Sequence, residues 1–207
     1  SPLQLILANV YHVDAPTGNI SLAEAEKVIR NPYIESGIPL AYGDNYRSFR
    51  IVGTDHSYPA HYDATISEGL LWEGVYDVTL GNAVASKTGL KEGDEFFSSH
   101  GLKDETDVHE DKAFTVVGIL AKSNSVIDKL ILTGVESVWG VHAEHDDLEL
   151  SVEELYASRE ITAVLLKKRN PMAILTLPNL LRETNMQVAL PAIEINRLNQ
   201  QFGIGAA

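Results

Sequence analysis

Residues 81–94 read Gly-Asn-Ala-Val-Ala-Ser-Lys-Thr-Gly-Leu-Lys-Glu-Gly-Asp, and this stretch decides how the middle of the chain is organised. Residues 82–88 predict a short helix, and Gly89 is the residue type that commonly ends a helix in the left-handed conformation. The polar residues 91–94, which include Gly93, predict a tight turn. We therefore expect a compact helix and turn here, with a strand starting at residues 95–98.

Strands are predicted around that helix and turn. Residues 113–120, Ala-Phe-Thr-Val-Val-Gly-Ile-Leu, are rich in β-branched and aromatic residues and form the clearest strand of the chain. The sequence also indicates strands at 72–80 and 130–133 and a short helix at 135–139. Residues 103–112 are too polar for a core and are expected to be a solvated loop or a hairpin tip, and residues 142–154 are an acidic stretch without a base.

The two ends of the chain predict a similar order of elements, without a repeat in sequence. For residues 1–65 we expect a strand at 3–11, a helix at 22–29 with capping residues at 19–21, and a hairpin of strands 37–42 and 46–52 around a turn at 43–45. For residues 158–207 we expect a strand at 160–166, a helix at 172–183 with Pro178 inside it, and a strand over 186–190 and 192–195 interrupted by Pro191. The predicted order of elements is β-α-β-β in residues 1–65 and β-α-β in residues 158–207.

These patterns predict an α+β fold in two subdomains. Two split βαβ units can pack as one sheet with helices on one face, which is a ferredoxin-like layer. Residues 1–65 plus 158–207 are therefore expected to form a discontinuous βαβ subdomain, and residues 66–157 an inserted small α/β subdomain.

Charge divides the chain at the same places. The 207 residues include 16 Lys and Arg against 29 Asp and Glu, a net charge of −13. Residues 66–157 hold six bases and nineteen acids, whereas residues 1–65 carry −3 and residues 158–207 carry +3. Binding of nucleic acid or anionic lipid over the whole surface is not expected, because both need basic patches. The acidity indicates that residues 66–157 form a separate inserted module, although charge alone leaves chance clustering open.

Cysteine is absent, which excludes disulfides, thiol nucleophiles and cysteine-ligated metals. No run of 18 apolar residues occurs, so no segment is predicted to span a bilayer. Because the chain starts with Ser1 and ends in the uncharged residues 202–207, we expect it to be a piece of a longer protein.

Few patterns point to chemistry. The phosphate-binding patterns GxxxxGK[ST] and GxGxxG are absent, as is the nucleophile pattern GxSxG. Two histidine clusters contain metal-ligand residue types, and for both a polar loop is the alternative interpretation. They are Asp55, His56, His61 and Asp63, and His142, His145, Asp146 and Asp147. In the second cluster the two histidines are three residues apart, one short of the HExxH zinc pattern.

Four segments, in order, resemble the extracytoplasmic domains of MacB/FtsX-like ABC transporter permeases. Residues 81–94 are similar to the family's G-x-x-(L/V)-A-x-x-x-G-L-x-x-G-D stretch, and residues 114–120 to its F-x-V-V-G-(I/V)-L strand. Residues 125–132 resemble x-x-x-D-(R/K)-x-(I/V)-(F/L), followed by the short helix at 135–139, and residues 50–55 resemble V-x-G-(T/V)-D. The matches cover residues 50–139 and are turn and strand patterns, so they imply no catalytic, cofactor-binding or metal-binding residue.

The resemblance implies a domain between the first two transmembrane helices of a bacterial permease, facing the periplasm or the extracellular side. The outer segments would form a membrane-proximal, porter-like subdomain, and a cognate cytoplasmic subunit would bind and hydrolyse ATP. The permease would couple that hydrolysis to work on a periplasmic substrate or adaptor protein, which is called mechanotransmission. Transmembrane helices before Ser1 and after Ala207 and a dimeric full permease are expected. The lengthened loops 103–112 and 142–154 depart from the core motifs and leave the subgroup open.

Three other functions remain open at this point. The same fold could serve as a regulatory scaffold that controls a cell-wall hydrolase. The second histidine cluster could make the chain a metal-binding or metal-sensing module. An enzyme is the remaining class, and no residue spacing marks a catalytic triad.

Overall fold

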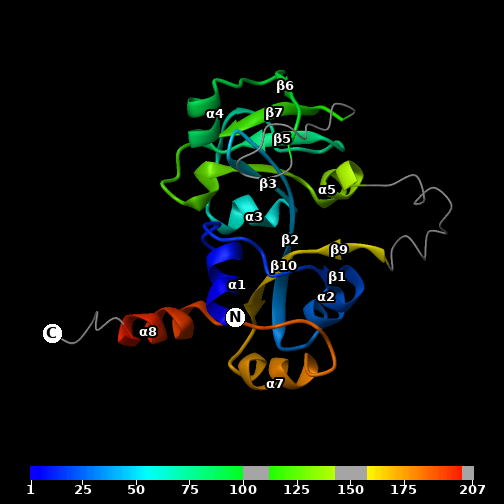
Figure 1. Ribbon diagram of the computed structural model, residues 1–207, viewed down its shortest axis with the longest axis vertical. Helices are drawn as coiled ribbons and strands as arrows, with labels where there is room; N and C mark the ends of the chain where they lie inside the picture. Colours follow the sequence, from blue (N-terminus) through cyan, green and yellow to red (C-terminus); the bar gives the residue numbers. More distant parts are fainter. Residues whose placement is uncertain (100–111, 143–157, 202–207) are drawn as a thin grey trace. The chain divides into compact units, whose positions relative to one another are not determined.

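A computed structural model of the protein describes residues 1–99, 112–142 and 158–201, with the side chain of His142 left out. The chain forms two compact units. The first unit comprises residues 1–37 and 166–207, and the second comprises residues 38–165. Both contain helices and strands (Figure 1), so the predicted α+β class is confirmed.

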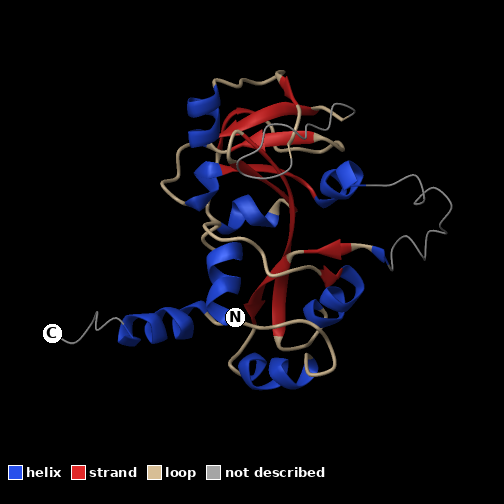
Figure 2. Cartoon of the chain, in the orientation of Figure 1, coloured by secondary structure: helices blue, strands red, loops and turns tan. Residues whose placement is uncertain are grey.

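A mixed sheet is the centre of the second unit (Figure 2). Its strand order is β10-β2-β3-β8-β5-β7-β4, and β6 pairs with β7 outside that path. The β3–β8 and β5–β7 pairs are parallel, whereas β2–β3, β5–β8, β4–β7 and β6–β7 are antiparallel. The strands are β2 (Ile34–Tyr46), β3 (Phe49–Thr54), β4 (Ile66–Gly69), β5 (Asp77–Leu80), β6 (Glu95–Phe96), β7 (Phe114–Leu120), β8 (Leu130–Gly134) and β10 (Ala163–Lys168).

Both faces of this sheet are buried. Along β3, Ile51 belongs to one apolar cluster and Val52 to another, and along β8 Ile131 and Leu132 divide in the same way. Successive side chains of a strand point to opposite faces, so the two clusters lie on opposite faces of the sheet. The helices of this unit are α3 (Ser57–His61), α4 (Asn82–Thr88), η1 (Val126–Lys129) and α5 (Val135–His142).

The predicted helix at 82–88 and its terminator are confirmed. α4 ends at Gly89, whose φ of 77° lies in the left-handed region that favours glycine. Lys91 donates its backbone N–H to Asp94 Oδ2 at 2.9 Å, which closes the predicted turn at 91–94. The strands predicted at 113–120 and 130–133 are also present, as β7 and β8, and the predicted helix at 135–139 extends to residue 142 as α5.

The predicted hairpin turn at 43–45 is wrong. β2 continues through these residues with an irregularity between Tyr42 and Asn45, and the chain reverses at Arg47 and Ser48, which have φ of 46° and 68°. Gly43 lies inside the strand, and a side chain at this position would meet Val138, which favours glycine there. Gly43 therefore serves close packing within the sheet, and Asp44 accepts a buried hydrogen bond from Ser98 Oγ at 3.1 Å.

The first unit is mainly helical. It contains α1 (Pro2–Asn9), α2 (Leu22–Ile29), α7 (Met172–Leu180), α8 (Pro191–Gln201) and parts of β2 and β10. Ser21 accepts a hydrogen bond from the backbone N–H of Glu24, which caps α2 as predicted. The core of this unit joins Val28 of α2, Ile34 of β2, and Ala173, Leu177 and Leu181 of α7 and its C-terminal end. Two short strands complete the described elements, β1 (Ile20–Ser21) and β9 (Glu160–Ile161).

Two predicted strands of the outer segments are absent: residues 3–11 are mostly helical, and of the second strand residues 192–195 are helical, whereas residues 186–190 form neither helix nor strand. Residues 3–11 lie mostly in α1, where Ser1 accepts from the Gln4 N–H and Pro2 stands in the first turn. The strand predicted over 186–190 and 192–195 is also wrong, because Pro191 begins α8. Proline in the first helical turn needs no hydrogen-bond partner for its nitrogen and has a suitable φ. In both places a helix-start signal outweighs the run of aliphatic residues.

The two units also differ from the predicted subdomain boundaries at residues 65 and 158. The chain divides at 37/38, within β2, and at 165/166, within β10, and β3 with most of β2 belongs to the second unit. Counted by these units, the first has seven bases and six acids, a net +1, and the second has nine bases and 23 acids, a net −14. The acidity belongs to the second unit.

Candidate interaction surface

The first predicted histidine cluster is engaged in local structure. Asp55 Oδ1 accepts from the Ser57 N–H at 2.8 Å, as aspartates at turns before helices do. The His56 Nε2–H donates to the Trp72 carbonyl at 2.8 Å, and the two rings meet edge to face. His61 packs against the Tyr62 ring, and Asp63 has a φ of 50°. Over the described residues, no three His, Cys, Asp or Glu side chains come close enough to hold a metal ion.

The second predicted cluster lies outside the described side chains. The backbone of His142 ends α5, whereas His145, Asp146 and Asp147 fall within residues 143–157. The acidic stretch 142–154 and the loop 103–112 therefore remain predictions, apart from Lys112, which donates to the Gly140 carbonyl.

One buried tyrosine, Tyr58, and two partly buried ones, Tyr42 and Tyr62, form a network at α3 that sequence reasoning did not find. Tyr58 of α3 donates its hydroxyl to Tyr62, and Arg50 of β3 lies over the ring of Tyr42 and hydrogen-bonds its hydroxyl. Burial raises the pKa of Tyr58 and of Tyr42 well above the ordinary value, and the Arg50 charge offsets this only in part at Tyr42. These hydroxyls stay protonated and serve as core hydrogen-bonding groups.

Asp128, in the family-like segment 125–132, holds a turn in place. Burial alone would raise its pKa, but hydrogen bonds from Ser123 and Asn124 hold the pKa below its ordinary value. Ser123 Oγ donates to Asp128 Oδ1 at 2.7 Å. The start of α4 lies directly against this turn. A side chain on Gly81 would therefore meet the Ile127 and Asp128 backbone. The motif residues therefore fix packing between α4 and η1, as fold markers.

Surface-exposed apolar side chains are more frequent in the first unit. Of the ten large exposed hydrophobic residues among the described ones, six lie in the first unit although it is the smaller. They are Tyr11, Val13, Met172, Leu175, Leu180 and Ile193. Where such residues are contiguous they mark contact surfaces, and Met172, Leu175 and Leu180 belong to one helix, α7.

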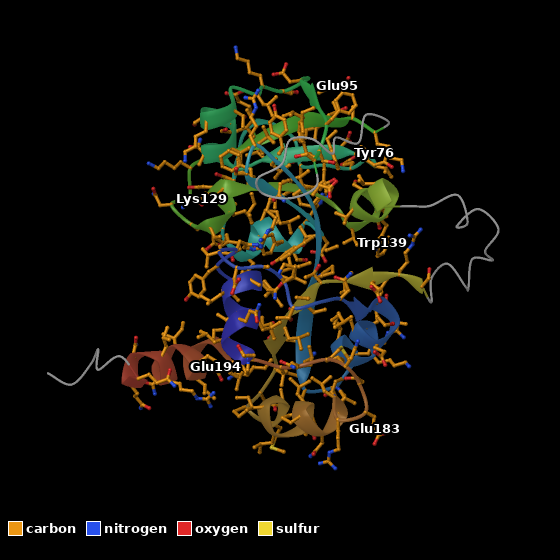
Figure 3. All side chains as sticks on the ribbon, in the orientation of Figure 1. Tyr76, Glu95, Lys129, Trp139, Glu183 and Glu194 are labelled. Atoms are coloured by element: carbon orange, nitrogen blue, oxygen red, sulfur yellow. The ribbon has the colours of Figure 1, made fainter. Side chains whose placement is uncertain are left out.

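The two ends of the described chain meet in the first unit. α1 contacts α8, and residues of both helices line a cavity of about 190 Å³. Glu194 of α8 (Figure 3) lies there. It forms an ion pair of 3.0 Å with Arg197, and both residues line the cavity together with Ser1 and Pro2. The described residues include no helix that is long and apolar enough to cross a bilayer.

Comparison with solved structures gives a fold. The periplasmic region of MacB from Actinobacillus actinomycetemcomitans aligns over 91% of this chain and 85% of its own, with 12% identity and a TM-score of 0.52. The chain has the fold of the MacB periplasmic region. No protein-family model matches the sequence, and no curated protein matches it. The MacB-like fold that the motifs predicted is thereby confirmed.

Two other solved structures align with this chain at lower TM-scores. The extracellular domain of the noncanonical ABC-type transporter YknZ from Gram-positive bacteria covers 89% of this chain, 85% of its own, at 10% identity and a TM-score of 0.49. A domain of a protein described as a permease, from Porphyromonas gingivalis, covers 83% and 73% at 15% identity and a TM-score of 0.45.

Proposed function

We propose that this chain is the extracytoplasmic domain of a MacB/FtsX-like ABC transporter permease that couples cytoplasmic ATP hydrolysis to work on a periplasmic substrate or adaptor protein. The observation that carries the proposal is the MacB-like fold over 91% of the chain. The four motifs at residues 50–139 support it independently, because they come from the sequence.

The resemblance places the two outer segments of the chain next to the membrane, and the first unit is built from those segments. We therefore assign the membrane-proximal, porter-like role to the first unit, a smaller assembly than residues 1–65 plus 158–207. The proposal requires no catalytic, cofactor or metal residue in this chain, and it places ATP hydrolysis in a separate subunit.

A genetic comparison tests the coupling. Deletion of the permease gene and an inactivating substitution in the ATP-binding subunit should produce the same loss of export, because each breaks the same coupling. Complementation with the complete permease is the control for the first strain. If the inactive ATP-binding subunit left the phenotype normal while the deletion did not, coupling would be disproved. Chained cells with normal export would instead favour the control of a cell-wall hydrolase.

A further inference from the structure

Helix α7 of the first unit is apolar on two opposite sides. Its nine residues include no charge, and its inner side places Ala173 and Leu177 in the core of the unit. Its outer side leaves Met172 and Leu175 with 46% and 67% of their surface exposed. Neighbouring exposed apolar side chains often mark a contact surface, so we expect Met172 and Leu175 to have a partner.

Bases surround the exposed side. Lys167, Lys168 and Arg169 precede α7 and are exposed, and Arg182 follows it. Residues 166–182 thus hold four bases and no acid in a chain with 29 acids and 16 bases. Two neighbouring acids offset part of this charge: Glu35 pairs with Lys167 at 2.8 Å, and Glu183 lies just past the end of α7 (Figure 3). With these two acids counted against the four bases, the net charge around α7 is +2.

This combination fits an anionic lipid surface. We propose that α7 and its flanking bases, Lys168 and Arg169 foremost, dock on the face of a bilayer that contains anionic lipids. The lipid phosphates would pair with the basic side chains, and Met172 and Leu175 would enter the boundary between headgroups and acyl chains. A second copy using the same surface would bring like charges together, which opposes that alternative.

The length of α7 fixes the mode of contact. Nine residues span about 13 Å at 1.5 Å per residue, whereas the hydrocarbon core is about 30 Å thick. The helix would therefore lie along the interface and not cross it. Because the attraction is partly electrostatic, docking should weaken as salt is raised.

Sedimentation with vesicles tests the proposal on the 207-residue chain. We expect binding to vesicles of phosphatidylglycerol and phosphatidylcholine and at least tenfold weaker partitioning to phosphatidylcholine alone. Lys168→Gln with Arg169→Gln, and separately Met172→Ser with Leu175→Ser, should each reduce partitioning to the mixed vesicles at least tenfold. The matched controls change exposed residues of the second unit: Lys87→Gln with Lys91→Gln for the bases, and Leu70→Ser with Val75→Ser for the apolar pair. Both controls should leave the partitioning to mixed vesicles unaltered.

Fluorescence reports insertion directly. Leu175→Trp should show a blue shift with mixed vesicles once the signal of Trp72 and Trp139 is subtracted, and Leu70→Trp should show none. Thermal unfolding followed by circular dichroism checks that each variant is folded. The proposal is overturned if the chain binds neither vesicle, or if the α7 variants bind as well as the controls. It is also overturned if light scattering shows a dimer that Leu175→Ser dissociates and vesicles are not bound.

Discussion

Gly81→Ala should destabilise the second unit by roughly 3–5 kcal/mol, at the upper end of single substitutions. A Cβ at this position would lie 2.3 Å from the Ile127 carbonyl oxygen and 2.5 Å from the Asp128 carbonyl. Neither neighbour can move easily, because Ile127 is fully buried and Asp128 is held by Ser123 and Asn124. The backbone of Gly81, with φ −65° and ψ 151°, suits any residue, so the effect would be steric alone.

Gly89→Ala at the other end of α4 is the matched control. Nothing lies within 4 Å of a Cβ there, and only the left-handed φ of 77° opposes alanine, at a cost of about 1 kcal/mol. Both tryptophans, Trp72 and Trp139, belong to the second unit, so urea unfolding followed by their fluorescence reads this unit specifically. Equal effects of the two substitutions would mean that α4 does not lie against η1 as described.

Leu177→Ala should cost the first unit roughly 2–4 kcal/mol, the usual range for emptying a buried leucine site. Leu177 is 6% exposed and packs with Val28 and Leu181. Leu175, two residues away on the same helix, is 67% exposed. Leu175→Ala should therefore change stability by less than about 0.5 kcal/mol, as surface substitutions usually do.

The first unit contains no tryptophan, so fluorescence does not report its unfolding. Hydrogen exchange at the amides of α2 and α7 measures the local stability of this unit in the two variants. Protection should fall in Leu177→Ala and stay near the wild-type level in Leu175→Ala. A comparable loss in both variants would show that Leu175 is a core residue, and the exposed face of α7 would then not exist.

Local signals were sufficient for part of this fold. The helix at 82–88 follows from the residues within it and from Gly89, and the strands at 114–120 and 130–134 follow from their own β-branched residues. The cap at Ser21 is equally local. These elements need no information from distant parts of the chain.

Other features depend on contacts that sequence does not display. The aliphatic run at 3–11 suits a strand or a buried helix, and the contact of α1 with α8 comes from the opposite end of the chain. The turn at Arg47 and Ser48 uses positive φ at residue types that rarely adopt it, so no signal marked it. The tyrosine network joins Tyr42 with Tyr58 and Tyr62 through the fold. The exposed side of α7 could have been suspected from the absence of charge between Arg169 and Arg182.

The central claim is that this domain faces the outside of the cytoplasmic membrane, and cysteine labelling tests it most directly. The chain has no cysteine, so Lys87→Cys adds one reactive thiol at an exposed position of α4. The complete protein with this substitution would be treated, in spheroplasts, with a maleimide that cannot cross the membrane, with the unsubstituted protein as the control. The proposed function predicts labelling of intact spheroplasts at the level seen after permeabilisation. Labelling only after permeabilisation would place the domain in the cytoplasm and contradict the account.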